Sequence, residues 1–244
     1  MTNKYIYFIA NWKMFGDLRT LNSLDKVIKF QKLNKQKKFK IIYCPPSTLI
    51  RPISKRLKKS KIEVGAQNCH ESDKFGPFTG QINSRMLKNV GAKYLILGHS
   101  ENRQNGDDNK KINLKIKSAI KAGLKVIFCI GETLHEKRKK ITKKVLSKQI
   151  KLGLNRIKDN RNILIAYEPV WSIGTGLIPR SKDLFDTINF IKKRMKNYKV
   201  LYGGSVNPKN INQLKSITNI DGYLIGGASQ NPKKFVDIIK KSYN

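Results

Sequence analysis

The sequence is poor in acidic residues, cysteine and histidine. Its 244 residues contain 16 Asp and Glu against 51 Lys and Arg, which gives a formal net charge of +35. The three cysteines, Cys44, Cys69 and Cys129, form no CxxC pair, and the three histidines have no paired ligand spacing. Disulfide scaffolds and structural zinc sites depend on such spacings. We therefore expect a reducing compartment and no metal site.

Long apolar runs are also missing. No stretch approaches the roughly 18 apolar residues that a membrane helix needs, and the N-terminus lacks the order of a secretory signal. Apolar residues still make up 39% of the chain and are spread along its whole length, which argues against disorder. We expect a globular cytoplasmic protein with no membrane partner.

The excess of positive charge permits a nucleic-acid interpretation, because Lys and Arg displace counterions from phosphate backbones. However, only 10 of the 51 basic residues are Arg, and the lysines are dispersed over every helical segment. No RNA-recognition, zinc-finger or basic-zipper pattern accompanies them. We therefore expect solvated helix faces and no specific nucleic-acid partner. Steering of a small anionic substrate is a further possibility.

Eight short apolar or β-branched runs predict eight β-strands, at Tyr5–Ala10, Lys40–Cys44, Ile62–Gly65, Tyr94–Leu97, Val126–Ile130, Ile163–Tyr167, Val200–Tyr202 and Tyr223–Ile225. Apolar residues spaced three or four apart predict helices between them, at Leu18–Ile28, Ile112–Ile120, Ile141–Ile157 and Leu184–Met195. Near-continuous apolar strands are typical of parallel sheets covered by crossover helices. With no linker in the chain, residues 1–244 are predicted to form a single-domain α/β protein, a closed (β/α)8 barrel.

Two local signals refine this prediction. No GxGxxG fingerprint follows the first strand, which disfavours an open dinucleotide-binding sheet, and no other cofactor motif stands out. Asn207-Pro208 combines an N-cap residue with a proline at the first helical position. The pair predicts that the helix after the seventh strand begins there.

Polar residues directly after the strands are the candidates for chemistry, because this barrel builds its site at the carboxyl ends of its strands. Lys13 could neutralise an anion there, and His99 is a candidate for proton transfer. Pro169 keeps Glu168 extended, and the apolar loop 170–173 could shield its carboxylate and raise its pKa. Each residue alone is more often an ordinary loop residue, so the combination carries the hypothesis.

Paired glycines end the last two strands, at Gly203-Gly204 and Gly226-Gly227. Glycine lets backbone N–H groups approach a ligand closely, and phosphate is the typical ligand at this place in a (β/α)8 barrel. Cys129 lies within an apolar run, and we expect it to pack in the core.

Five motifs together resemble the triosephosphate isomerase family: NWK at 11–13, GHSE at 98–101, AYEPVW at 166–171, IGTG at 173–176 and YGGS at 202–205. The resemblance implies a TIM barrel and an aldose–ketose isomerase that needs no cofactor. It would interconvert dihydroxyacetone phosphate and D-glyceraldehyde 3-phosphate through an enediol(ate), in glycolysis and gluconeogenesis. The alternatives are another phosphate-binding barrel isomerase or lyase, and a basic nucleic-acid-binding barrel without catalysis.

The resemblance also implies residue roles. Glu168 would be the base and His99 would polarise the carbonyl and move protons. Lys13 and Asn11 would stabilise negative charge, with Glu101 as a supporting carboxylate. The implied substrate-binding residues are Asn11, Lys13, Gly174, Ser205, Gly226 and Gly227, and the implied hinges of the closing loop are Trp171 and Thr175.

The segment 65–80 resembles the loop by which members of this family insert into a neighbouring subunit. It implies a homodimer formed through the loop around Asn68–Thr79, with Thr79 near Asn11 of the partner subunit. Gln81 and Asn102 stand where the family usually has Glu and Arg that pair across subunits. The interface would therefore lack that salt bridge without leaving one charge unpaired.

Overall fold

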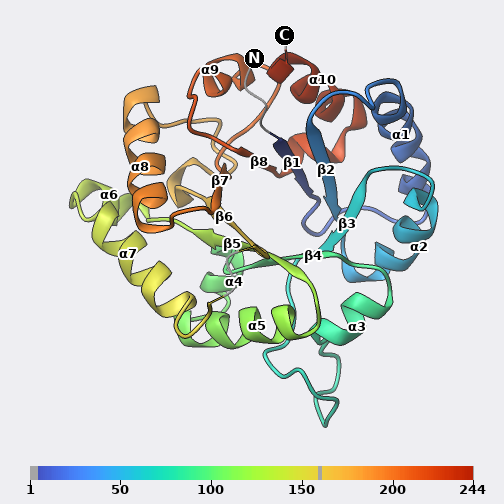
Figure 1. The fold of residues 1–244 in the computed structure, drawn as a ribbon, viewed down its shortest axis with the longest axis horizontal. Helices are drawn as coiled ribbons and strands as arrows, with labels where there is room; N and C mark the ends of the chain where they lie inside the picture. Colours follow the sequence, from blue (N-terminus) through green and yellow to red (C-terminus); the bar gives the residue numbers. More distant parts are fainter. Residues whose placement is uncertain (1–4, 159–160, 244) are drawn as a thin grey trace.

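The computed structural model describes residues 5–158 and 161–243, so the ends of the predicted range 1–244 lie outside the described residues (Figure 1). Eight parallel strands close into a barrel in chain order, with β1 hydrogen-bonded to both β2 and β8. The strands are β1 (Ile6–Asn11), β2 (Phe39–Cys44), β3 (Glu63–Ala66), β4 (Tyr94–Leu97), β5 (Lys125–Ile130), β6 (Ile163–Tyr167), β7 (Lys199–Tyr202) and β8 (Gly222–Ile225). The predicted fold is confirmed, and each strand lies within one residue of its predicted bounds.

Helices surround the barrel on its outer side (Figure 1). The α-helices are α1 (Leu24–Leu33), α2 (Ser47–Leu57), α3 (Ser84–Asn89), α4 (Ser100–Gln104), α5 (Asn109–Lys121), α6 (Leu134–Arg138), α7 (Thr142–Gly153), α8 (Ser181–Arg194), α9 (Ile211–Lys215) and α10 (Pro232–Tyr243). Three short 3₁₀ helices complete the described elements: η1 (Arg19–Ser23), η2 (Val170–Ser172) and η3 (Gly227–Gln230). None of the helices within 5–158 and 161–243 is long and apolar enough to cross a bilayer.

Strand residues alternate between two apolar layers, as their period of two requires. In β1, Phe8 packs outward with the helix-facing core, whereas Ile9 points into the barrel, where it belongs to a separate cluster with Ile96 and Leu201. Both faces are therefore buried, which explains why the strands read as continuous apolar runs. Because side chains fill the barrel interior, a ligand site has to form at its rim.

The prediction for the start of the helix after β7 is wrong. That helix, α9, begins at Ile211 with Asn210 as its N-cap. Asn207 does act as a cap, since its Oδ1 accepts the N–H groups of Lys209 and Asn210. The capped segment is a turn over 208–210 that precedes the helix.

Two helical segments also end differently from the prediction. The segment Leu18–Ile28 is divided between η1 and the first part of α1. Helix α7 ends at Gly153, although the apolar spacing continues to Ile157. A Cβ on Gly153 would overlap the ring of Phe128, so the helix comes unusually close to β5 at this point. Ile157 still packs on the core from the following turn, which explains the longer pattern.

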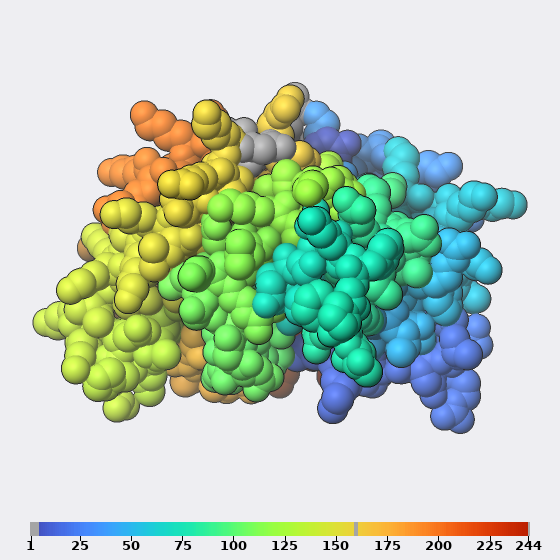
Figure 2. Space-filling model, turned by 90° about the horizontal axis from the view of Figure 1, so that it is seen from below, coloured from blue at the N-terminus to red at the C-terminus, as the bar shows by residue number. Residues whose placement is uncertain are grey.

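The connection between β3 and α3 reaches away from the ring in Figure 1 and stands on the surface, in teal, in Figure 2. It carries Phe75 and Phe78 in exposed positions. A backbone hydrogen bond from His70 to Ile82, 2.8 Å long, joins the two sides of the connection near its base. The projecting segment therefore presents apolar side chains to solvent in this chain.

Candidate functional site

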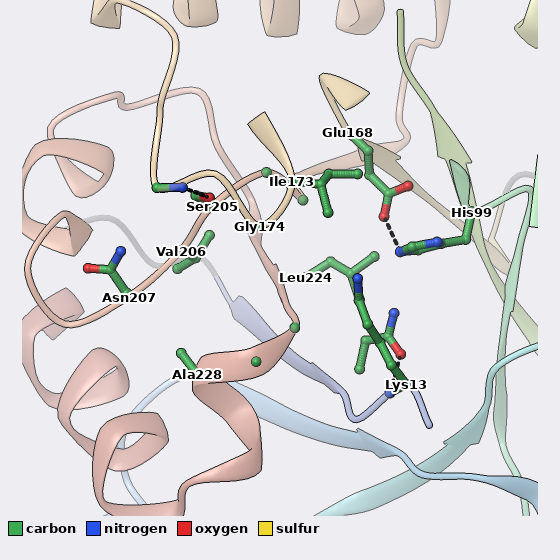
Figure 3. Close-up of a pocket in the computed structure, with 16 residues that line it drawn as sticks. Lys13, His99, Glu168, Ile173, Gly174, Ser205, Val206, Asn207, Leu224 and Ala228 are labelled. Atoms are coloured by element: carbon green, nitrogen blue, oxygen red, sulfur yellow. Dashed lines mark hydrogen bonds and ion pairs between the residues drawn. The ribbon is translucent and has the colours of Figure 1, made fainter. Parts of the chain in front are cut away.

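A pocket of about 290 Å³ opens at the carboxyl ends of the strands (Figure 3). Eight of the nine residues predicted for the site line it, from the ends of five strands and the loops that follow them: Asn11, Lys13, His99, Glu168, Gly174, Ser205, Gly226 and Gly227. Glu101 is absent from the lining and contacts two of the lining residues, Lys13 and His99. The structure therefore brings the candidate residues together around one cavity.

Glu168 follows β6 and is 2% exposed. Its backbone N–H donates to the carbonyl of Ile130, so the backbone of Glu168 is fixed to the end of β5. Burial raises the pKa of the carboxyl above its usual value, and His99, the Cys129 thiol and Lys13 moderate this rise. Among the described residues, no donor lies within hydrogen-bond distance of Oε1. The carboxylate is thus held with one oxygen free to accept a proton.

Two glycines make room for Glu168, one for its backbone and one for its side chain. A Cβ on Gly203 would stand 2.7 Å from Cγ of Glu168, and a Cβ on Gly131 would overlap the carbonyl oxygen of Glu168. The sequence interpretation assigned Gly203 to phosphate binding. In the structure Gly203 lies against the side chain of Glu168, and its own N–H is used by the carbonyl of Tyr167. This glycine therefore leaves space for the side chain of Glu168.

His99 is the N-cap of α4, and its Nδ1 accepts the N–H of Glu101 at 3.2 Å. A ring nitrogen that accepts a hydrogen bond carries no proton, so the neutral imidazole has its proton on Nε2. Nε2 lies 3.6 Å from Oε1 of Glu168, and the two side chains face one another in Figure 3. The local helix therefore presents an N–H donor to the pocket beside the carboxylate.

Lys13 enters the pocket from the loop after β1. Its backbone has φ of 55°, a left-handed conformation that is unfavourable for lysine. Its Nζ lies 2.6 Å from Oε1 of Glu101, and Glu101 also approaches Nδ1 of His99 at 3.6 Å. Asn11 precedes Lys13 and accepts its N–H at 3.1 Å. Glu101 therefore connects the cation and the imidazole without lining the cavity.

The loop after Glu168 covers part of the pocket. Its Ile173 lies beside Glu168 in Figure 3, whereas Val170 is outside the lining. The N–H of Gly176 donates to Oγ of Ser205 at 3.0 Å, and this hydroxyl donates to the carbonyl of Ser172 at 2.6 Å. These bonds fasten the loop to the segment after β7. They also occupy the Ser205 hydroxyl.

The opposite part of the pocket is lined by exposed backbone. Gly174 and Gly227 have no atom within 4 Å of the place where a Cβ would stand. At Gly226, a Cβ would stand 3.4 Å from Cε of Lys13. Open glycine backbone on two sides, together with an ammonium group, suits a small anion.

Sequence reasoning missed two side chains that support the site. Cys129 is fully buried, as predicted, but its thiol also lies beside Glu168 and moderates the rise in the pKa of that carboxyl. Glu132 accepts the indole N–H of Trp171 at 2.9 Å, at the predicted hinge of the loop. Glu132 stands just after β5, so the strand-end rule could have found it. Within the described ranges, no three His, Cys, Asp or Glu side chains gather as metal ligands would.

Comparison with known proteins identifies relatives over nearly the whole chain. A family model described as triosephosphate isomerase matches residues 6–242. The triosephosphate isomerase of Thermodesulfovibrio yellowstonii is 40% identical over 98% of this chain and 100% of its own length. That of Dictyoglomus thermophilum is 42% identical over 95% and 97%. The crystal structure of triosephosphate isomerase from Bartonella henselae superposes with a TM-score of 0.88 at 33% identity, over 100% of both chains.

Proposed function

The chain belongs to the triosephosphate isomerase family, and from that premise we propose that it interconverts dihydroxyacetone phosphate and D-glyceraldehyde 3-phosphate. The observation that carries the proposal is the buried carboxylate of Glu168, with one oxygen free of donors, opposite Nε2–H of His99 in a pocket that also holds Lys13. An aldose–ketose isomerase needs such a base beside an electrophile. The reaction transfers protons only, so it calls for no cofactor.

The first step is abstraction of a proton from C1 of dihydroxyacetone phosphate by Glu168. Burial raises the pKa of this carboxyl, and a base is most effective when its pKa approaches the working pH. The same carboxyl then returns the proton to C2 of the enediol(ate) to give the aldehyde. The Cγ of Glu168 is confined by Gly203, so the carboxylate keeps its direction through both transfers.

Negative charge develops on the substrate oxygens during the first step. Nε2–H of His99 donates a hydrogen bond to the carbonyl oxygen and can pass its proton between the two oxygens. The ammonium of Lys13 and the amide of Asn11 stabilise the same charge, which is worth most in a site shielded from water. Glu101 positions both groups: its carboxylate pairs with Lys13, and its backbone N–H donates to Nδ1 of His99.

The phosphate group is held by glycine backbone. We assign the N–H groups of Gly174, Ser205, Gly226 and Gly227 to it, because all four residues line the pocket. The N–H of Ser205 would exchange its long bond to Oγ of Ser172, 3.4 Å, for the phosphate. The loop closed by the Gly176–Ser205 bond excludes water from the enediol(ate). This exclusion limits the side reactions of the intermediate, among them loss of phosphate.

The direct test is a coupled assay of the purified protein with each triose phosphate. Turnover in both directions supports the proposal, and absence of turnover rejects it in favour of another phosphate-binding barrel. Glu168→Asp withdraws the carboxylate by one methylene. We expect kcat to fall by about a hundredfold with a smaller change in KM, because misplacement of about 1 Å has an effect of that size.

We further propose a homodimer formed through the loop around Asn68–Thr79. Two exposed apolar side chains support it: Phe75, 75% exposed on this loop, and Met14, 99% exposed beside Lys13. Phe78, 44% exposed, lies on the same loop as Phe75, and large apolar side chains that share a projecting loop are typical of interaction sites. In sedimentation equilibrium, Phe75→Asp should shift the protein toward monomer. Leu33→Asp, at an equally exposed leucine at the end of α1, should not.

We also propose that residues 1–244 act as one domain and that the enzyme works in the cytoplasm, in glycolysis and gluconeogenesis. All three cysteines are free and buried, which suits a reducing compartment. Deletion of the gene should block growth that depends on triose-phosphate interconversion. Growth that remains normal on such carbon sources would argue against this role.

A further inference from the structure

The backbone around Lys13 is held by side-chain amides. The strand pairing of β1 ends where the N–H of Trp12 donates to the carbonyl of Cys44. The next three backbone polar groups are the carbonyl of Trp12, the N–H of Lys13 and the carbonyl of Lys13. Each of them bonds to the amide of a different Asn or Gln side chain. This arrangement occurs at a residue whose φ of 55° needs support from its surroundings.

Gln230 provides the first amide. Its Nε2 donates to the carbonyl of Trp12 at 3.0 Å, across 218 residues of sequence. The indole N–H of Trp12 donates in return to the carbonyl of Ser229 at 3.2 Å. Gln230 is the last residue of η3, and Gly227 is the first. The pair of bonds therefore ties the loop that carries Lys13 to the short helix that begins with a pocket glycine.

Gln67 provides the second amide. It follows β3, and its Nε2 donates to the carbonyl of Lys13 at 2.9 Å and to that of Cys44 at 2.8 Å. Asn11 supplies the third contact by accepting the N–H of Lys13. In the described part of the chain, no other group bonds to these three backbone atoms of Trp12 and Lys13. The left-handed turn is thus fixed from β3 on one side and from η3 on the other.

We propose that Gln67 and Gln230 are positioning residues for the ammonium group of Lys13, and that Gln230 couples Lys13 to the glycines that hold the ligand's phosphate. The inference rests on the proposed function, because it takes the ligand to be a phosphate dianion. Neither glutamine lines the pocket. Both act by keeping the end of the Lys13 side chain over Gly226. A Cβ on this glycine would stand 3.4 Å from Cε of Lys13.

The test measures binding of inorganic phosphate by ³¹P NMR titration, so that it does not depend on turnover. Gln230→Leu keeps the size of the side chain and removes the donor. We expect its phosphate affinity to fall about five- to tenfold, the usual effect of one lost hydrogen bond. The matched control is Gln213→Leu, at an exposed glutamine on α9 whose Nε2 reaches only Oγ of Ser181 at 3.5 Å. The control should bind phosphate like the parent.

A double-mutant cycle separates positioning from general structural damage. In a Lys13→Met background, Gln230→Leu should cause no further loss of affinity, because the group that it positions is gone. A structural defect would instead multiply the two losses. Gln67→Met gives a second cycle with the same expectation. If Gln230→Leu does not fold, the Gln67 cycle decides alone.

Every outcome of this experiment is decisive. Unchanged phosphate binding in both glutamine variants, or equal losses with and without Lys13, would overturn the positioning role while leaving the isomerase proposal intact if the parent turns over. If the glutamine variants weaken phosphate binding only when Lys13 is present, but the parent shows no turnover, the positioning role stands and the isomerase proposal is rejected. A parent that binds no phosphate would reject the positioning role, and the coupled assay alone would then decide the isomerase proposal.

Discussion

Each end of the barrel holds a glutamate out of full contact with water, Glu168 buried and Glu63 half-buried, and the surroundings shift the two pKa values in opposite directions. At the carboxyl end, burial raises the pKa of Glu168 and its neighbours compensate only partly. At the amino end, burial would also raise the pKa of Glu63, but Lys40 at 3.1 Å and Lys93 at 3.4 Å bring it below its usual value. The same side chain is a base at one end and half of an ion-pair network at the other.

The same contrast extends to other groups at the two ends. Near the amino end, Asp221 pairs with Lys192 at 2.7 Å and accepts the N–H of Val200 at 2.8 Å. At the carboxyl end, Lys13 has a left-handed backbone and Glu168 has an oxygen without a donor. Uncompensated charge and strained backbone are unfavourable for folding, and they gather where a ligand would make use of them. The difference distinguishes the functional end from the structural end without reference to any relative.

The largest expected effect is that of Glu168→Gln. This change keeps the shape and removes the base, so kcat should fall by about a thousandfold or more, within the range attributed to general bases. Stability should be unchanged or slightly higher at neutral pH, because a buried charge disappears. Coupled assays and urea unfolding of the same samples measure both quantities. A variant that is inactive because it is unstable would contradict the assignment.

Gly203→Ala should have the next largest effect. The added methyl group would press on Cγ of Glu168 at 2.7 Å and displace the carboxylate. We expect kcat to fall by about ten- to a hundredfold, since small misplacements of a catalytic group have effects of that order. The double variant with Glu168→Gln serves as the control, in which the alanine should have little further effect on kcat. Normal kcat in Gly203→Ala would show that the carboxylate is free to move aside.

The barrel could be predicted because its signals are local. The run Ile163–Tyr167 reads as a buried strand from its own residues, and Glu168 at its end is found by counting from that strand. The contacts that define the site are different in kind. Gly203 touches Glu168, and Gln230 touches Trp12, only after β6 meets β7 and the barrel closes on β1.

Partners of this kind leave no pattern in the sequence, because a glutamine or glycine in a loop has many ordinary uses. The start of α9 was missed for a related reason: the side chain of Asn207 can cap a turn just as well as a helix. Sequence therefore indicated which groups could do chemistry. Closure of the barrel determined what holds those groups in place.

Glu63→Gln should leave the rate constants unchanged and lower stability instead. The change leaves Lys40 and Lys93 without their carboxylate at the amino end of the barrel. We expect a loss of about 2 kcal/mol, between the values for surface pairs and fully buried ones, since these lysines are partly exposed. Urea unfolding at neutral pH measures the loss. A fall in kcat together with the fall in stability would show that the two ends of the barrel do not act independently.

The smallest and most specific effect is the pH dependence of these stability differences. The pKa of Glu63 is lowered from 4.5 in the folded chain, so its contribution is present above that value and is lost as pH falls through the lowered folded pKa. The advantage of the parent over Glu63→Gln should therefore shrink in acid. The pKa of Glu168 is raised from 4.5, so its contribution is present below that value and is lost as pH rises through the raised folded pKa. The free energy of unfolding of the parent, relative to that of Glu168→Gln, should therefore fall as pH rises. Urea unfolding from about pH 3 to about pH 8 measures both stability differences, and the two curves should have opposite slopes. Two curves of the same slope would contradict the opposite pKa shifts of the two glutamates.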